Sequence, residues 1–104
     1  MPRELTREET YAAFDLETDL RLQVIDYLET IHPGEIQREN EIHRCLINDI
    51  IWQKMQIERE DYDVAISKYN LVEDEYVLRR SEEVEERISE EMRQYLIEPM
   101  INAP

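Results

Sequence analysis

The best candidates for metal chemistry are two carboxylates and two imidazoles in the first half of the chain. Glu35, Glu39 and His43 are spaced four residues apart, which places them on one face of a helix. His32 lies just before them, and this set of oxygen and nitrogen ligands suits a transition metal. A structural role is the competing interpretation, because His43 also falls in a register of apolar residues typical of a helix interface. We predict that the protein needs no cofactor and keep metal binding as an alternative.

Nucleophilic chemistry has a weak basis in this sequence. Cys45 is the only cysteine, so no disulfide can form within the chain. The nearest histidine, His43, lies two positions away, and residues two apart on a helix point in different directions. We therefore expect Cys45 to be a buried structural thiol. The single glycine also excludes a glycine-rich phosphate loop, and we predict that the protein is not an enzyme.

The glutamate-rich segment 81–96 could serve two kinds of chemistry. Clustered carboxylates can hold magnesium, although no paired acidic motif is recognisable here. They can also imitate the phosphate charges of a nucleic acid, although interleaved arginines such as Arg87 and Arg93 weaken that mimicry. Apolar residues recur among the glutamates every three or four positions, which predicts a packed helix rather than a floating tail. These residues are Val84, Ile88, Met92 and Tyr95.

The composition limits the class of protein to which the chain belongs. Its 104 residues suffice for one domain, which we predict to span 1–104. The formal net charge of −14 repels nucleic acids and anionic membranes, so we expect neither as a direct partner. No apolar run reaches membrane-spanning length, and the first ten residues contain no apolar segment typical of a secretory signal. Because a lone cysteine also suits a reducing compartment, we expect a cytoplasmic protein.

The scarcity of turn-forming residues predicts an all-α fold. The chain contains one glycine and four prolines, too few for the many turns of an all-β protein. Thr6 and Glu9 have the spacing of a capping box, which predicts the start of a helix just after Thr6. This first helix should end before Pro33 and Gly34, because proline restricts the residue before it and glycine favours a turn.

The remainder of the chain has few recognisable helix breaks. No glycine or proline occurs between Glu35 and Glu98. Asn70 can end a helix in the left-handed conformation, and Asp74 can cap the helix that follows. A continuous helix through Asn70 is the alternative. The prediction is a bundle of about three helices near 7–31, 35–68 and 74–97, with frayed ends at 1–5 and 99–104.

Two sets of residues recur every seven positions. A repeat of seven keeps one seam of a helix against a partner helix. The second set lies five positions after the first, roughly 140° around a helix, so the middle segment has two apolar faces. Three helices around one core need one face each, and we interpret the surplus as a surface for a second chain. The first set is Ile36, His43, Ile50, Ile57, Val64, Leu71 and Leu78, and the second is Met55, Tyr62, Tyr69 and Tyr76.

The surplus apolar surface leads to the predicted function. We expect a small acidic helical module for protein–protein interaction, such as an adaptor, chaperone or regulatory subunit, which forms a homodimer. The alternatives are an acidic nucleic-acid-mimicking inhibitor of a basic partner and a metal-binding helical-bundle protein. The predicted partner-binding residues are Ile50, Ile57, Val64, Leu71, Leu78, Tyr62, Tyr69 and Tyr76.

Overall fold

The computed structural model describes residues 3–96, and this part of the chain contains helices and no strand. The all-α prediction is therefore confirmed. The prediction of about three helices is corrected to five α-helices within the described residues. They are α1 (Arg7–Leu28), α2 (Ile36–Met55), α3 (Arg59–Lys68), α4 (Glu75–Arg87) and α5 (Glu90–Leu96), with the 3-10 turns η1 (Pro33–Glu35) and η2 (Leu71–Glu73) between them.

Helix α1 begins with the capping box that its sequence predicts. The Glu9 backbone N–H donates to the Thr6 hydroxyl at 3.1 Å, and the Thr6 backbone N–H donates to the Glu9 carboxylate at 2.9 Å. These two bonds satisfy donors that a helix N-terminus would otherwise leave unpaired. The helix ends at Leu28 rather than 31. His32 instead caps the following turn, because its Nδ1 accepts a hydrogen bond from the Gly34 backbone N–H at 3.1 Å.

The predicted helix 35–68 is broken at a position without an obvious sequence signal. Gln56 adopts the left-handed conformation, with φ of 58°, and its N–H donates to the Trp52 carbonyl at 2.8 Å. A left-handed glutamine is uncommon, so packing must offset the free-energy cost of this backbone conformation. The break places Ile57 in the core and turns α3 back across α1. Tertiary burial therefore overrides the local preference for a longer helix.

The break at Asn70 is confirmed, which excludes the continuous helix. Asn70 is left-handed with φ of 52°, and the Asp74 carboxylate caps α4 by accepting from the Val77 N–H at 3.1 Å. The predicted helix 74–97 divides again after Arg87. Ser89 starts α5, since its hydroxyl accepts from the Met92 N–H at 3.1 Å.

The predicted frayed ends lie only partly within the described residues. Residues 1–2 and 99–104 fall outside them. Residues 3–5, in contrast, pack on the fold: Leu5 is buried, and its carbonyl accepts from the Tyr69 hydroxyl at 2.8 Å. Arg3 donates to the Gln56 carbonyl at 2.7 Å. This short segment therefore holds the turn between α2 and α3 in place.

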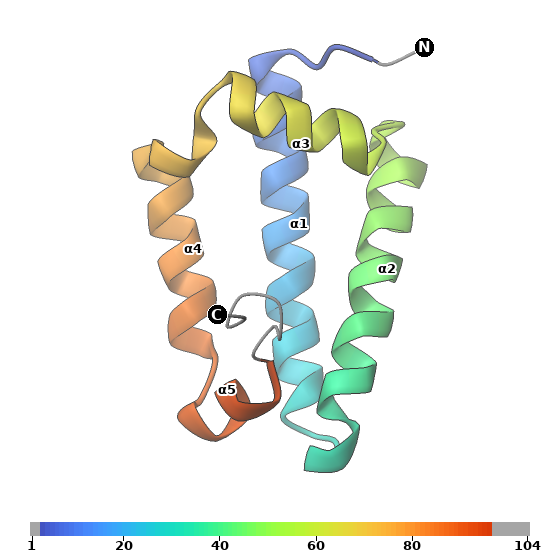
Figure 1. The fold of residues 1–104 in the computed structure, drawn as a ribbon, viewed down its shortest axis with the longest axis vertical. Coiled ribbons are helices and arrows are strands. Elements are labelled where there is room, and N and C mark those ends of the chain that lie inside the picture. The colour runs from blue at the N-terminus through green and yellow to red at the C-terminus, as the bar shows by residue number, and fades with distance from the viewer. Residues whose placement is uncertain (1–2, 97–104) are drawn as a thin grey trace, which may run out of the picture.

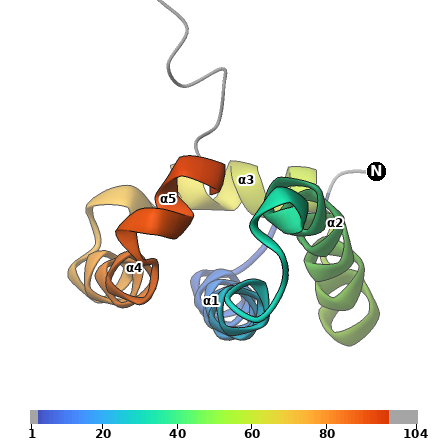
Figure 2. The same ribbon diagram turned by 90° about the horizontal axis from the view of Figure 1, so that it is seen from below.

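Helix α1 is the central helix of the five. Helix α1 stands between α4 and α2 and packs against both, and α3 crosses it near one end (Figure 1). Helices α3 and α5 lie on the same side of α1, as the view along the helices shows (Figure 2). The two short helices therefore cover opposite ends of one face.

Most of the buried residues form two clusters along α1. The α3-end cluster consists of Leu5, Ala13, Ile47, Ile51, Ile57, Tyr62 and Ala65. The α5-end cluster consists of Ile25, Leu28, Ile36, Val84 and Met92. Because α3 and α5 each cover only one end, a cavity remains between them on the face of α1 that they share.

Helix α4 is held to α1 largely by polar contacts. It buries only Val77 and Val84. Arg87 donates to Asp26 at 2.7 Å and Arg80 donates to Asp19 at 2.5 Å, so two arginines bridge to carboxylates of α1. Such part-exposed ion pairs contribute modestly to stability. Their arrangement explains why α1 carries aspartates along the side that faces α4.

The cap of α4 predicts a loss of stability in acid. Hydrogen bonds from the Tyr11 hydroxyl and from the Val77 N–H hold the pKa of the Asp74 carboxyl below its ordinary value of 3.8. A lowered folded-state pKa stabilises the fold above the unfolded-state pKa, and this stabilisation is lost as pH falls through the folded value. We expect the urea midpoint to drop between pH 5 and about pH 3.

The control for this prediction is Asp74→Asn. Asparagine caps helices about as well as aspartate but does not titrate. Urea titrations at pH 7 and pH 3 should therefore show a smaller drop for the variant than for the unchanged protein. Equal drops in the two proteins would show that Asp74 does not contribute to the acid sensitivity.

Candidate interaction surface

Helix α2 has an apolar face that no other described element covers. Ile42 and Leu46 are each 45% exposed, and Ile50 continues the row at the same spacing of four, partly exposed. We call these three residues the α2 stripe. The neighbouring face of the helix, about 100° around from the stripe, is buried at Ile47 and Ile51. Helix α2 is thus apolar on two sides, although the core uses only one.

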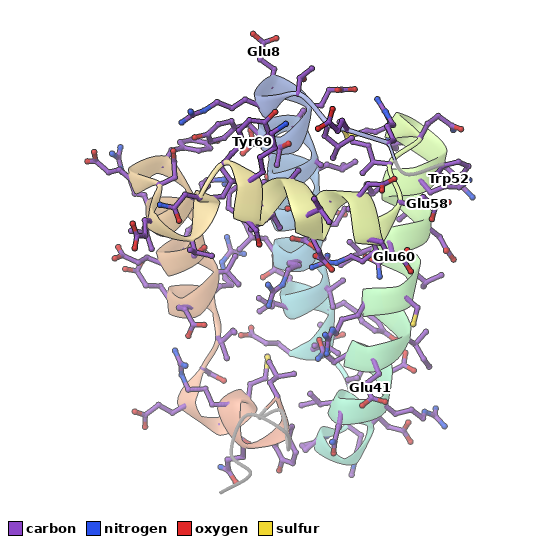
Figure 3. All side chains as sticks on the ribbon, turned by 45° about the horizontal axis from the view of Figure 1, so that its top comes forward. Glu8, Glu41, Trp52, Glu58, Glu60 and Tyr69 are labelled. Atoms are coloured by element: carbon purple, nitrogen blue, oxygen red, sulfur yellow. The ribbon has the colours of Figure 1, made fainter. Side chains whose placement is uncertain are left out.

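Trp52 and Cys45 widen the exposed apolar area of α2. Trp52 is 44% exposed and extends from the side of α2 that faces away from α1 (Figure 3). Cys45 lies seven residues earlier and therefore shares its side of the helix. It is exposed, so the expectation of a buried thiol is wrong. The core needs only the Ile47 side of α2, which leaves Cys45 outside it.

The electrostatic character of α2 differs from that of the whole chain. The segment Ile36–Met55 contains three acidic residues (Glu39, Glu41, Asp49) and three basic residues (Arg38, Arg44, Lys54), which cancel to zero. The whole chain has a net charge of −14. Like-charge repulsion between two copies is therefore weakest where their α2 helices meet.

The predicted partner-binding residues separate into buried and exposed groups. Ile57, Tyr62 and Leu71 are fully buried in the chain's own core, so they are not accessible to a partner while the fold is intact. Ile50 and Tyr69 are partly exposed, and Val64, Leu78 and Tyr76 are exposed. The breaks at Gln56 and Asn70 explain this, because they distribute the seven-residue register over α2, α3, η2 and α4. The register forms no continuous seam.

The tyrosine set is anchored within the fold by its hydroxyl groups. Tyr62 donates to the Glu17 carboxylate at 3.2 Å, and Tyr76 donates to the Asp15 carboxylate at 2.6 Å. Burial, together with the negative charge of Glu17, raises the pKa of Tyr62 far above its usual range. Tyr62 therefore remains a neutral donor at every physiological pH. These hydrogen bonds tie α3 and α4 to α1.

The candidate metal ligands have other partners. Glu39 accepts a hydrogen bond from the Tyr27 hydroxyl at 3.1 Å, which raises the pKa of that hydroxyl. Glu35 pairs with Arg38 at 2.9 Å. The His43 ring packs edge-on against Tyr27, with ring centres 5.2 Å apart. Within residues 3–96, no three histidine, cysteine, aspartate or glutamate side chains are grouped as a metal would require.

The glutamate-rich segment is partly neutralised by arginines. Glu83 accepts from Arg80 at 2.8 Å, and Glu85 accepts from Arg93 at 2.9 Å. These pairs interrupt the row of free carboxylates that nucleic-acid mimicry would need. Ile88, predicted within one continuous helix, instead lies in the connection between α4 and α5. Among the described residues, no helix is both long and apolar enough to cross a membrane.

Sequence reasoning missed Ile42 and Leu46. His43 and Ile50 belong to the seven-residue register. Ile42 and Leu46 do not, but with Ile50 they form a row of three aliphatic residues spaced by four. That spacing is a helical signal in its own right. It could have identified a second apolar face within α2 alone.

Comparisons with known proteins identify no relative of this chain. Models of protein families, curated proteins and solved structures were each compared with the chain, and none of the three comparisons found a match. The functional argument therefore depends on the surface of the molecule itself.

Proposed function

We propose that the protein is a non-catalytic protein–protein interaction module that forms a homodimer through the α2 stripe. The observation that carries the proposal is the exposure of Ile42 and Leu46 on a helix whose other face is already in the core. Isolated exposed apolar residues are common in monomers. A row of them along one helix face is typical of a binding surface instead.

A second copy of the chain is the occupant favoured by the charges. The α2 helix is neutral while the whole chain is strongly acidic. Two copies that paired through α1 or α4 instead would bring net negative helices together. In a two-fold arrangement of antiparallel α2 helices centred on Leu46, Ile42 of one copy meets Ile50 of the other. The α2 stripe of each copy is then covered by the α2 stripe of the other.

The remaining surface supports a role as an adaptor or regulatory subunit. The negative charge stays on the outside of such a dimer, mainly on α1 and α4. Complementary charge steers association and selects partners. A protein with a basic surface is therefore the partner class that fits best.

The decisive variant for this proposal is Leu46→Glu. It places two carboxylates at the two-fold axis, and we expect the dissociation constant of the dimer to rise by at least about tenfold. Light scattering on a sizing column measures the mass at a series of concentrations. Because like charges repel, the unchanged dimer should tighten as salt rises.

The matched control is Val64→Glu. Val64 is the most exposed of the predicted partner-binding residues, at 68%, but it lies on α3, away from the α2 stripe. This variant should keep the dimer, and circular dichroism should show both variants folded. A monomeric unchanged protein, or equal dissociation in both variants, would contradict the proposal.

A further inference from the structure

A small pocket lies at the end of the bundle where α1 ends and α5 packs (Figure 1). Its volume is about 340 Å³, near the lower limit of the roughly 300–1,000 Å³ that ligand sites usually occupy. Six residues give it an apolar lining: Leu28, Ile31, Pro33, Ile36, Met92 and Tyr95. The pocket therefore has room and a suitable surface for a short hydrocarbon chain.

The polar lining of this pocket is acidic. The carboxylates of Glu29 and Glu91 and the hydroxyl of Ser89 complete it, and no arginine, lysine or histidine belongs to the described lining. Neither carboxylate accepts a hydrogen bond from, or forms an ion pair with, another described residue. Arg87 is near enough to Glu29 for the two charges to interact, but its guanidinium donates to Asp26 at 2.7 Å and does not line the pocket.

The end of α1 adds to the negative potential of the pocket. The last carbonyls of a helix carry a partial negative charge, and the last turn of α1 contains no basic residue. A pocket of this volume is only about 9 Å across, which is similar to the ~8–10 Å over which salt screens a charge at physiological ionic strength. Both carboxylates therefore attract a cation held in the pocket, even one that contacts only one of them.

We propose that this pocket binds a primary alkylammonium ion. Its hydrocarbon stem contacts the apolar lining, and its three N–H donors face the acceptors of the polar lining. The Ser89 hydroxyl oxygen already accepts from the Met92 N–H at 3.1 Å and has a second lone pair to offer. The same chemical group occurs in a free amine and in the lysine side chain of a protein. The proposal does not depend on the dimer, because the α2 stripe does not line the pocket.

The test uses hexylammonium as the probe and an NMR chemical-shift titration of the isotope-labelled full chain at pH 7 as the measurement. We expect saturable shifts of the Ser89 and Met92 amide signals. The dissociation constant should be at least about tenfold lower than that of hexanol, which has the same stem and no charge. Hexanoate has the same stem and the opposite charge, so it should not bind.

Two variants test the carboxylates. Glu29→Gln and Glu91→Gln should each weaken hexylammonium binding by about threefold, the effect expected for a partly exposed ion pair, and the double variant by about tenfold. The matched control is Glu82→Gln. Glu82 is an exposed residue of α4 that does not line the pocket, so this variant changes the net charge equally but should leave the affinity unchanged. Circular dichroism should show all variants folded.

Three results would each overturn the proposal. They are the absence of saturable shifts at Ser89 and Met92, equal affinity for hexylammonium and hexanol, and equal losses in Glu29→Gln and Glu82→Gln. The last of these would mean that the overall charge of the chain attracts the probe. Leu46→Glu should bind hexylammonium normally, which separates this test from that of the dimer.

A second titration identifies the source of the ammonium group. The peptide acetyl-Gly-Lys-Gly-amide carries the same stem as butylammonium, so the two probes differ only in the attached backbone. Peptide binding at least as tight as that of butylammonium supports a lysine of a protein partner as the ligand. Binding of butylammonium alone supports a free amine, because the pocket then excludes the backbone.

Discussion

Tyr62→Ala should destabilise the protein more than any exposed substitution, by about 3–5 kcal/mol in the free energy of unfolding. Tyr62 is only 1% exposed and belongs to the α3-end cluster. Its removal leaves a large cavity under α3 and also takes away one of the two donors to the Glu17 carboxylate, which keeps only Arg59. Urea denaturation followed by circular dichroism measures the change.

Tyr62→Phe separates the ring from the hydroxyl. Phenylalanine keeps the buried ring and removes only the hydrogen bond to Glu17, so the expected loss is about 1 kcal/mol. If Tyr62→Ala cost no more than Tyr62→Phe, the burial of the ring would not stabilise α3. A stable Tyr62→Ala variant that failed only in self-association would instead support the sequence interpretation of Tyr62 as a partner-binding residue.

Leu71→Ala should cost about 2–5 kcal/mol, the usual range for a buried leucine. Leu71 is 1% exposed and lies in η2, the turn that joins α3 to α4. Its side chain fastens this turn to the core, so truncation should loosen both helices. Thermal and urea unfolding should both report the loss.

The adjacent residue provides a matched control. Val72 is 66% exposed, and Val72→Ala should change the free energy of unfolding by less than about 0.5 kcal/mol. Similar losses at Leu71 and Val72 would contradict the burial pattern of η2. A Leu71→Ala variant of normal stability that no longer dimerises would show that the register residue serves association, as its sequence position alone predicts.

Together these variants separate the stabilising core from the proposed binding surface. The seven-residue register includes residues of both kinds, since Leu71 is buried while Val64 is exposed. Core substitutions should act on stability at every protein concentration. Substitutions in the α2 stripe should act on the dimer and depend on concentration. The proposed dimer can therefore be tested separately from the stability of the fold.

Local signals in the sequence were enough to predict the helical class and several helix ends. Thr6 and Glu9 form their capping box, and Asn70 and Asp74 mark a true helix break. Caps and left-handed termini depend on residues only a few positions apart. The stabilisation that these helix ends provide can therefore be predicted without knowing which distant segments pack against them.

Only the tertiary structure decided how the apolar residues are used. Gln56 has no conformational preference that would end a helix. Helix α2 nevertheless ends there, because Ile57 then enters the core. The choice between a buried and an exposed face is made by the helix that packs opposite, and periodicity cannot identify that helix. For this reason the sequence predicted two apolar faces in the middle segment but included Ile57 and Leu71 among the partner-binding residues. The fold, in contrast, buries both residues and leaves Ile42 and Leu46 on the surface.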